Sequence, residues 1–99
     1  MNPFDMLKNA KALQEQFSRM QGQLDETRVV GSSGGGIVKI ELNGKFEILS
    51  VTLDPVAVDP RDVPMLQDLI VAAHRDASEK VKEVLKGRFG QMAGGFPAP

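Results

Sequence analysis

The sequence predicts an α+β fold in which a long N-terminal helix, a three-stranded antiparallel sheet and a long C-terminal helix follow one another. A heptad pattern of apolar residues runs through the first part of the chain. An alternating stretch interrupted by Asn43-Gly44 follows, and an apolar stripe with a period of 3.6 residues comes last. The 99 residues suit one domain. We assign residues 1–92 to this domain and residues 93–99 to a flexible C-terminal tail.

The first helix is expected from Pro3 to about Glu26. Asn2 is a good N-cap, and proline suits the first helical position. The apolar residues advance in alternating steps of four and three, which is a heptad seam: Met6, Ala10, Leu13, Phe17, Met20 and Leu24. Either the seam packs on the chain's own sheet, or its free end packs against a second copy. We favour the second copy because three heptads exceed what one short sheet can cover.

Three strands are expected between the helices. The β-branched stretch Thr27–Val30 predicts the first strand. Residues 37–42 alternate, and Asn43-Gly44 is typical of a two-residue type I′ turn into a third strand. The glycine-rich stretch 31–36 lacks the lysine and the helix of a phosphate-binding loop. We therefore interpret it as a sheet corner that uses positive φ angles and close backbone approach.

A two-residue turn sets the register of the hairpin and therefore its faces. It pairs Leu42 with Lys45, Ile40 with Glu47 and Val38 with Leu49. One face then carries the residues Val38, Ile40, Leu42, Leu49, Val51 and Leu53. Phe46 and Ile48 fall on the more polar face, so either a bulge resets the third strand or a second copy covers that face.

The second long helix is expected to start at a proline-containing cap, at either Asp59 or Asp62. Its apolar stripe begins at Met65, and the helix weakens at Gly87 before reaching Met92. Two oppositely charged pairs with a spacing of four residues are predicted on its surface: Arg75 with Glu79, and Asp76 with Lys80.

The composition and the motifs of the sequence do not indicate an enzyme. The chain has no cysteine, and its single histidine, His74, flanks the apolar stripe, so no metal site is expected. Ser32 and Ser33 have no evident activating base, and the carboxylates are scattered. We predict no enzyme, no cofactor and no small-molecule substrate. We also expect neither a signal peptide nor a membrane partner, and a cytoplasmic location.

The charge is unevenly distributed although its net value is only −1. Residues 1–24 carry +1, residues 25–79 carry −5 and residues 80–99 carry +3. Because local fields attract a polyanion, the basic ends favour phosphate contacts with double-stranded DNA. The pI of about 5.8 and the absence of Trp and Tyr favour an alternative: a protein-interaction or scaffold module that uses the heptad helix or the exposed sheet face without binding DNA.

Four motifs carry a resemblance to a known family. They are Gly31-Ser32-Ser33-Gly34-Gly35-Gly36 before a Val-Lys-Ile strand, Asn43-Gly44, Leu53-Asp54-Pro55 and the stretch from Leu66 to Ala77. In this order they resemble the YbaB/EbfC nucleoid-associated proteins of bacteria. The resemblance implies an α-β-β-β-α subunit in a tweezer-like homodimer. It also implies DNA binding in the cytoplasm and nucleoid, with a role in chromosome organisation or gene regulation.

The resemblance also indicates where DNA contacts are expected. The family's contacts are attributed to the helices that flank the sheet, which here implies Lys8, Lys11, Arg19, Lys82, Lys86 and Arg88. For the dimer interface we select residues of the seam and of the more polar sheet face: Met6, Leu13, Phe17, Met20, Phe46 and Ile48.

Overall fold

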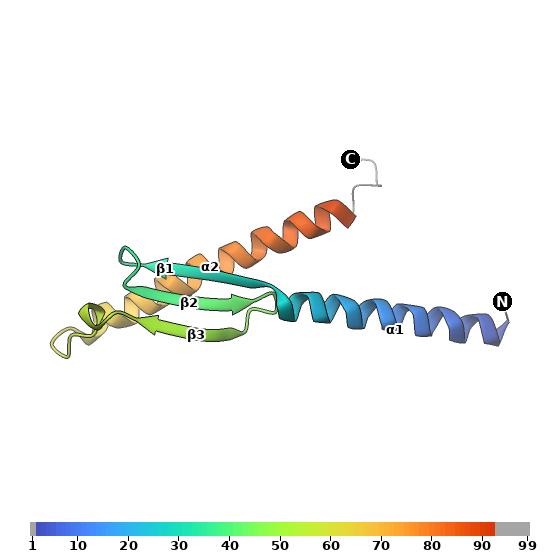
Figure 1. Ribbon diagram of the computed structural model, residues 1–99, viewed down its shortest axis with the longest axis horizontal. Coiled ribbons are helices and arrows are strands. Elements are labelled where there is room, and N and C mark those ends of the chain that lie inside the picture. The colour runs from blue at the N-terminus through green and yellow to red at the C-terminus, as the bar shows by residue number, and fades with distance from the viewer. Residues whose placement is uncertain (1, 93–99) are drawn as a thin grey trace.

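The computed structural model describes residues 2–92, and the predicted tail, residues 93–99, lies outside them. The elements are α1 (Pro3–Glu26), β1 (Arg28–Ser33), β2 (Val38–Asn43), β3 (Ile48–Leu53), the 3-10 turn η1 (Pro55–Ala57) and α2 (Val63–Met92). The strands form one antiparallel sheet in the order β1-β2-β3, which confirms the predicted fold class. The molecule measures 69 × 31 × 18 Å. Figure 1 shows α1 projecting from one end of the sheet and α2 crossing one sheet face.

The core lies where α2 packs on β1 and β2. Its buried apolar residues are Val38, Ile40, Leu42, Ala57, Ala73, Ala77 and Val81. Gly31 allows the closest approach, because a methyl group there would overlap the backbone of Ala73 and Ala77 in α2. Gly31 therefore belongs to β1, and the strand runs to Ser33 rather than ending at Val30 as predicted.

The turn between β1 and β2 contains the three other glycines of the glycine-rich stretch 31–36. Gly34, Gly35 and Gly36 all have positive φ angles, which side-chain-bearing residues rarely adopt. The N–H of Gly36 donates to the carbonyl of Ser33 at 3.0 Å. The predicted sheet corner is confirmed, with Gly31 supplying the close approach and the later glycines supplying the left-handed backbone.

The β2–β3 hairpin differs from the prediction of a two-residue type I′ turn. The left-handed residue of the turn is Phe46, with a φ of 64°. The side-chain oxygen of Asn43 accepts the N–H of Glu47 at 3.0 Å and closes a loop one residue longer than predicted. Gly44 has another function: its N–H donates to the carbonyl of Leu24 at 2.8 Å and docks the turn on the end of α1.

The longer loop changes the register of β3. The observed pairs are Val38–Leu53, Ile40–Val51 and Leu42–Ile48, and the predicted pairs Val38–Leu49, Ile40–Glu47 and Leu42–Lys45 are wrong. A bulge between Glu41 and Leu42 resets Ile48, which confirms the first explanation for the residues on the polar face. Away from the bulge the register moves by an even number of residues, so Val51 and Leu53 stay on the predicted face.

The start of α2 is set by the second of the two predicted caps. Oδ1 of Asp62 accepts the N–H of Met65 at 3.1 Å. Asp59 instead accepts the N–H and the guanidinium of Arg61. The helix continues through Gly87 to Met92. No helix within residues 2–92 combines the length and apolarity that a membrane span needs.

Candidate nucleic-acid interface

α1 stands free of the rest of the chain. Its first turn is capped by Asn2, whose side-chain oxygen accepts the N–H of Phe4 at 3.1 Å. No residue of this helix is buried, and the exposed fraction reaches 67% at Leu13 and 59% at Phe17. The interpretation that the seam packs on the chain's own sheet is therefore wrong. Only the last turn, near Leu24, touches the sheet, through the docked hairpin.

The cations of α1 share the face opposite the seam. At 3.6 residues per turn, Lys8, Lys11 and Arg19 fall within about 80° of one another. Glu15 lies among them, and a hollow on this face is lined by Lys11, Gln14, Glu15, Ser18 and Arg19. The amphipathic helix therefore keeps its basic face and its apolar seam apart, so one can meet a polyanion while the other meets protein.

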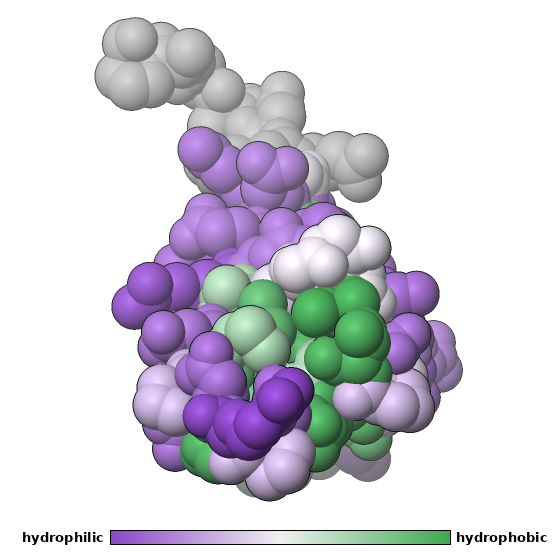
Figure 2. All heavy atoms as spheres, turned by 90° about the vertical axis from the view of Figure 1, so that its left-hand side faces the viewer, coloured by the Kyte–Doolittle hydropathy of each residue, from purple (hydrophilic) through white to green (hydrophobic). Residues whose placement is uncertain are grey.

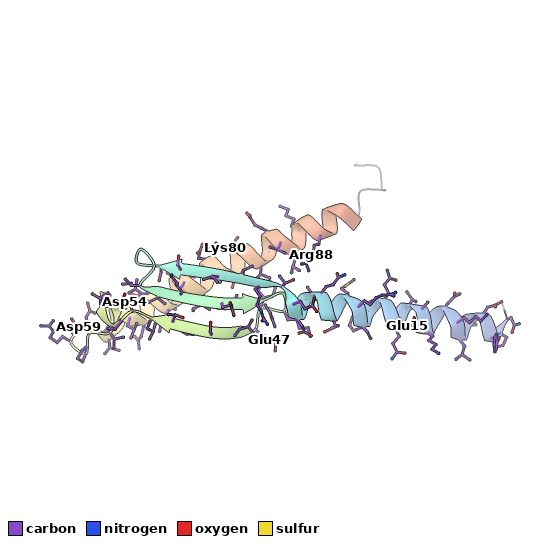
Figure 3. The ribbon with its side chains drawn as sticks, viewed as in Figure 1. Glu15, Glu47, Asp54, Asp59, Lys80 and Arg88 are labelled. Atoms are coloured by element: carbon purple, nitrogen blue, oxygen red, sulfur yellow. The ribbon has the colours of Figure 1, made fainter. Side chains whose placement is uncertain are left out.

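Lys80 and Asp76 on α2 clamp the outer edge of β1. The N–H of Ser32 donates to Asp76 at 2.9 Å, and Nζ of Lys80 donates to the carbonyl of Val30 at 2.9 Å. The two side chains also form the predicted ion pair, at 3.2 Å. The Ser32 N–H, and then the Lys80 side chain, lower the pKa of the Asp76 carboxyl. Figure 3 shows Lys80 beside β1, so this cation stabilises the fold rather than facing a ligand.

The other cations of α2 lie on its exposed C-terminal part. Nζ of Lys82 is 3.4 Å from Glu79, so Glu79 pairs there and the predicted Arg75–Glu79 pair is wrong. Both side chains are largely exposed, so this pair restrains Lys82 only weakly. Lys86 and Arg88 are exposed as well. Helical geometry places Lys82 and Lys86 on one side of α2 and Arg88 more than about 100° away.

Arg88 faces α1 across a cleft of about 560 Å³. The cleft is lined by Gln16, Arg19, Met20, Gln23 and Leu24 from α1 and by Leu85 and Arg88 from α2. Two arginines thus line one cleft from two helices, and the lining contains no carboxylate. Figure 3 shows Arg88 on the side of α2 that is turned toward α1. Two guanidinium groups in a cleft whose described lining holds no carboxylate attract phosphate or another anion.

The structure therefore groups only some of the predicted DNA-binding residues. Arg19 belongs both to the basic face of α1 and to the cleft, where it joins Arg88. Lys82 and Lys86 lie apart from this cleft. Sequence periodicity could not reveal the cleft, because it says which side of each helix is apolar but not how two helices cross.

The predicted interface residues are all exposed, and the structure adds others that the sequence analysis placed in the core. Every residue of β3 is exposed, because α2 covers β1 and β2. Val51 and Leu53 keep exposed fractions of 46% and 37% beside the buried Ile40 and Val38 of β2. Of the predicted apolar face, therefore, only the residues of β2 are buried in the core. No local signal distinguishes the two strands, since both alternate in the same way.

Further apolar side chains follow β3 in the chain. Figure 2 looks onto the end of the molecule where β3 leads into α2 and shows hydrophobic atoms gathered at the surface. The exposed apolar residues of this segment are Val56, Val58, Val63 and Met65. The open apolar surface thus continues from the strand into the connection. Within residues 2–92 no three histidine, aspartate or glutamate side chains gather as a metal site. His74, which flanks the apolar stripe of α2, is half-buried.

Comparisons with known proteins agree with this description. Residues 1–96 match the model of the YbaB/EbfC DNA-binding family. A nucleoid-associated protein of Dictyoglomus thermophilum is 45% identical over 98 residues, which cover 99% of this chain and 94% of that protein. One of Mycobacterium tuberculosis is 44% identical over 94 residues, covering 95% and 71%. The crystal structure of an uncharacterized protein from Helicobacter pylori shares the fold, with a TM-score of 0.72, 22% identity and coverage of 93% and 97%.

Proposed function

The chain belongs to the YbaB/EbfC DNA-binding family, and on this premise we propose that it binds double-stranded DNA as a homodimer, chiefly through phosphates. We place it in the cytoplasm, associated with the nucleoid, with a role in chromosome organisation or gene regulation. The observation that carries the proposal is the cleft that Arg19 of α1 and Arg88 of α2 both line, with no carboxylate among its described lining residues. An arginine binds phosphate through two parallel N–H donors, which makes this pair the proposed anchor.

The other proposed contacts extend from this anchor along the two helices. The full proposed set is Lys8, Lys11, Arg19, Lys82, Lys86 and Arg88, and a homodimer carries it twice. Contacts of this kind position a protein on the duplex without reading bases. They therefore need no stacking aromatics, which agrees with the absence of Trp and Tyr.

The second copy is supported by the exposed apolar surface. Large exposed apolar patches on small proteins mark sites of association. We propose that the seam of α1 and the end of the hairpin contribute to the dimer, through Met6, Leu13, Phe17, Met20, Phe46 and Ile48. Met6, Leu13 and Phe17 lie opposite the basic face of α1, so their contacts leave that face open to phosphates. Met20 also lines the cleft of Arg19 and Arg88, so there the two surfaces adjoin.

A titration of labelled duplex over a salt series tests the DNA proposal. If about 6–10 phosphates are contacted, the affinity falls by about 10³–10⁵ between 50 and 200 mM salt. Binding that is absent at low salt, or that does not respond to salt, contradicts the proposal. Competition by an unrelated duplex checks that the contacts are largely independent of sequence.

Charge reversal locates the contacts. Arg19→Glu and Arg88→Glu each occur twice in a dimer, so each should weaken binding and reduce the magnitude of the salt slope by about two. Lys39→Glu is the matched control, because Lys39 lies exposed on the sheet, away from both helices. It makes the same change in net charge, so an equal loss of affinity for this control would show that only overall charge matters. Circular dichroism and light scattering check that each variant keeps its fold and mass.

The exposed seam supports a second candidate function, a protein-interaction or scaffold module without DNA binding. Its support is the exposure of Leu13 and Phe17 on a helix with no buried residue. The salt titration separates the two candidates. If the chain is an interaction module, it should show no affinity for duplex DNA even at low salt. Charge reversal of Arg19 and Arg88 should then leave its assembly unchanged.

A further inference from the structure

Asn43 and Gly44 form the one Asn-Gly pair of the sequence, and both residues are buried where β2 leads into the hairpin turn. In such a pair the backbone nitrogen of the glycine can attack the side-chain amide of the asparagine and close a cyclic imide. Glycine favours the attack because it has no side chain to hinder the approach and its backbone turns freely. An Asn-Gly pair in an unrestrained segment therefore deamidates spontaneously in water.

The side-chain amide of Asn43 is held by three hydrogen bonds. Its Oδ1 accepts the N–H of Lys45 at 2.9 Å and the N–H of Glu47 at 3.0 Å. Its Nδ2 donates to Oε1 of Glu47 at 2.8 Å, and the residue is only 4% exposed. Ring closure requires Cγ of Asn43 to turn toward the nitrogen of Gly44, so these bonds must break first.

The attacking nitrogen is held by the last turn of α1. The N–H of Gly44 donates to the carbonyl of Leu24 at 2.8 Å. A methyl group on Gly44 would lie 2.9 Å from that oxygen, so the helix packs directly over the glycine. Beside this contact, Nζ of Lys45 pairs with Asp25 of α1 at 2.9 Å. The nitrogen of Gly44 has to lose its proton and face Cγ of Asn43, and it can do neither while α1 is docked.

We infer that Asn43 is a site of spontaneous deamidation which the docked α1 protects, so that the reaction proceeds when α1 leaves the hairpin turn. A bond forms between the nitrogen of Gly44 and Cγ of Asn43, and the bond from Cγ to Nδ2 breaks. The proton of the Gly44 N–H leaves with Nδ2 as ammonia. One water molecule then opens the imide at either carbonyl and gives aspartate or isoaspartate. Local opening, which this reaction requires, needs less free energy than unfolding of the whole chain.

The product disfavours renewed docking of α1. An aspartate at position 43 has no N–H for Glu47, so two carboxylates would face one another where Nδ2 now donates. Both the lost hydrogen bond and the like charges destabilise the turn in a buried site. In isoaspartate the backbone passes through the former side chain and gains one carbon before Gly44, which displaces the N–H of Gly44 from Leu24. The docked helix thus prevents a modification that would itself release the helix.

Release of α1 also bears on the cleft of Arg19 and Arg88. The cleft lies between α1 and α2, so its shape depends on how α1 leaves the sheet. Deamidation should therefore weaken the binding of duplex DNA. This consequence rests on the proposed function, whereas the modification itself does not.

The rate of deamidation in two charge variants tests the protection by α1. Asp25→Lys places a second ammonium beside Lys45 and disfavours docking. Glu15→Lys is the matched control, because it makes the same charge change on an exposed part of α1 away from the hairpin. Mass spectrometry of the peptide that contains Asn43, after incubation at mildly alkaline pH, measures the conversion. It should be about 2–5-fold faster in Asp25→Lys and unchanged in Glu15→Lys.

The unaltered protein sets the range of the measurement. Its Asn43 should convert at least about tenfold more slowly in buffer than in urea, where the turn is open. Equal rates in buffer and in urea overturn the inference, because the fold then gives no protection. Equal rates in Asp25→Lys and Glu15→Lys overturn the role of α1.

Asn43→Asp tests the effect of the product, with Asn9→Asp on the exposed face of α1 as the matched control. Hydrogen exchange at the Gly44 amide should be at least about tenfold faster in Asn43→Asp and unchanged in Asn9→Asp. Unchanged protection in both variants overturns the release of α1. If Asn43→Asp fails to fold, the rates in the unaltered protein and in Asp25→Lys still decide. These rates are measured without DNA, so a chain that binds no duplex contradicts the proposed function and leaves the inference standing.

Discussion

β1 and β3 flank the same central strand, but only β1 is covered by the helix that makes the core. Gly31 of β1 lies against Ala73 and Ala77, and the strand's outer groups are bonded by α2 side chains. β3 has every residue exposed. The difference shows that α2 divides the sheet into a covered part that stabilises the single chain and an exposed part that supports the proposed association.

The largest loss of stability is expected from Gly31→Ala. The added methyl group overlaps the backbone of α2, so the helix must lift from β1. Overpacking of this kind costs about 3 kcal/mol of unfolding free energy or more when backbone has to move. Gly22→Ala is the control, since nothing lies within 4 Å of its added methyl. It should stabilise by about 0.5–1 kcal/mol through helix propensity. Urea unfolding of both variants measures the difference, and equal stabilities would contradict the role of the close approach.

Val51→Lys, at the exposed edge strand β3, should weaken the proposed dimer without unfolding the chain. The lysine would place a charge in the exposed apolar surface that supports the proposed homodimer, and an unpaired charge buried in an interface costs several kcal/mol. The dimer should therefore be at least about 100-fold weaker, which corresponds to about 2.7 kcal/mol. Light scattering over a concentration series measures this dissociation. Val30→Lys, on the clamped edge, should leave the mass unchanged. If instead it dissociates the dimer as strongly as Val51→Lys does, the difference between the edges has no bearing on association.

The smallest effect is expected from Asp76→Asn, which weakens the clamp without moving α2. The Ser32 N–H and Lys80 lower the pKa of Asp76 in the folded chain. A carboxyl whose folded pKa lies below its unfolded value stabilises the fold above the unfolded pKa, about 3.9. This contribution is lost as the pH falls through the folded pKa. The Tm of the variant should therefore be slightly lower than that of the parent at pH 7, and the gap should close on acidification. A gap that persists at the lowest pH would assign the effect to shape rather than to charge.

Local patterns predicted much of the fold. The heptad seam and the Asn2 cap gave the right bounds for α1, and the Asp62 cap was one of two predicted starts for α2. The alternation of β2 and β3 assigned Val51 to the correct face. The prediction of the β2–β3 turn was wrong, because Asn43-Gly44 forms a type I′ turn only when no other group competes for the hydrogen bonds of these two residues. Here the end of α1 binds Gly44, and the side chain of Asn43 closes the longer loop.

The candidate site was predicted as a set of charges and not as a surface. Arg19 and Arg88 were selected for their sign and their place near the helical ends. That they line one cleft depends on the angle at which α2 leaves the sheet. That angle follows from the packing of Gly31 on Ala73 and Ala77, residues that are far apart in the chain.

By itself the sequence determined the order of the elements, their approximate bounds and the side of each element that is apolar, because these follow from contacts between residues three or four positions apart in helices or two apart in strands. Only the tertiary structure decided which strands α2 covers, and with that which edge of the sheet is closed. β2 and β3 carry equivalent apolar alternation, so periodicity cannot separate them. The close backbone approach at Gly31 and the clamp from Asp76 and Lys80 place the helix over β1 and β2, and they leave Leu49, Val51 and Leu53 exposed.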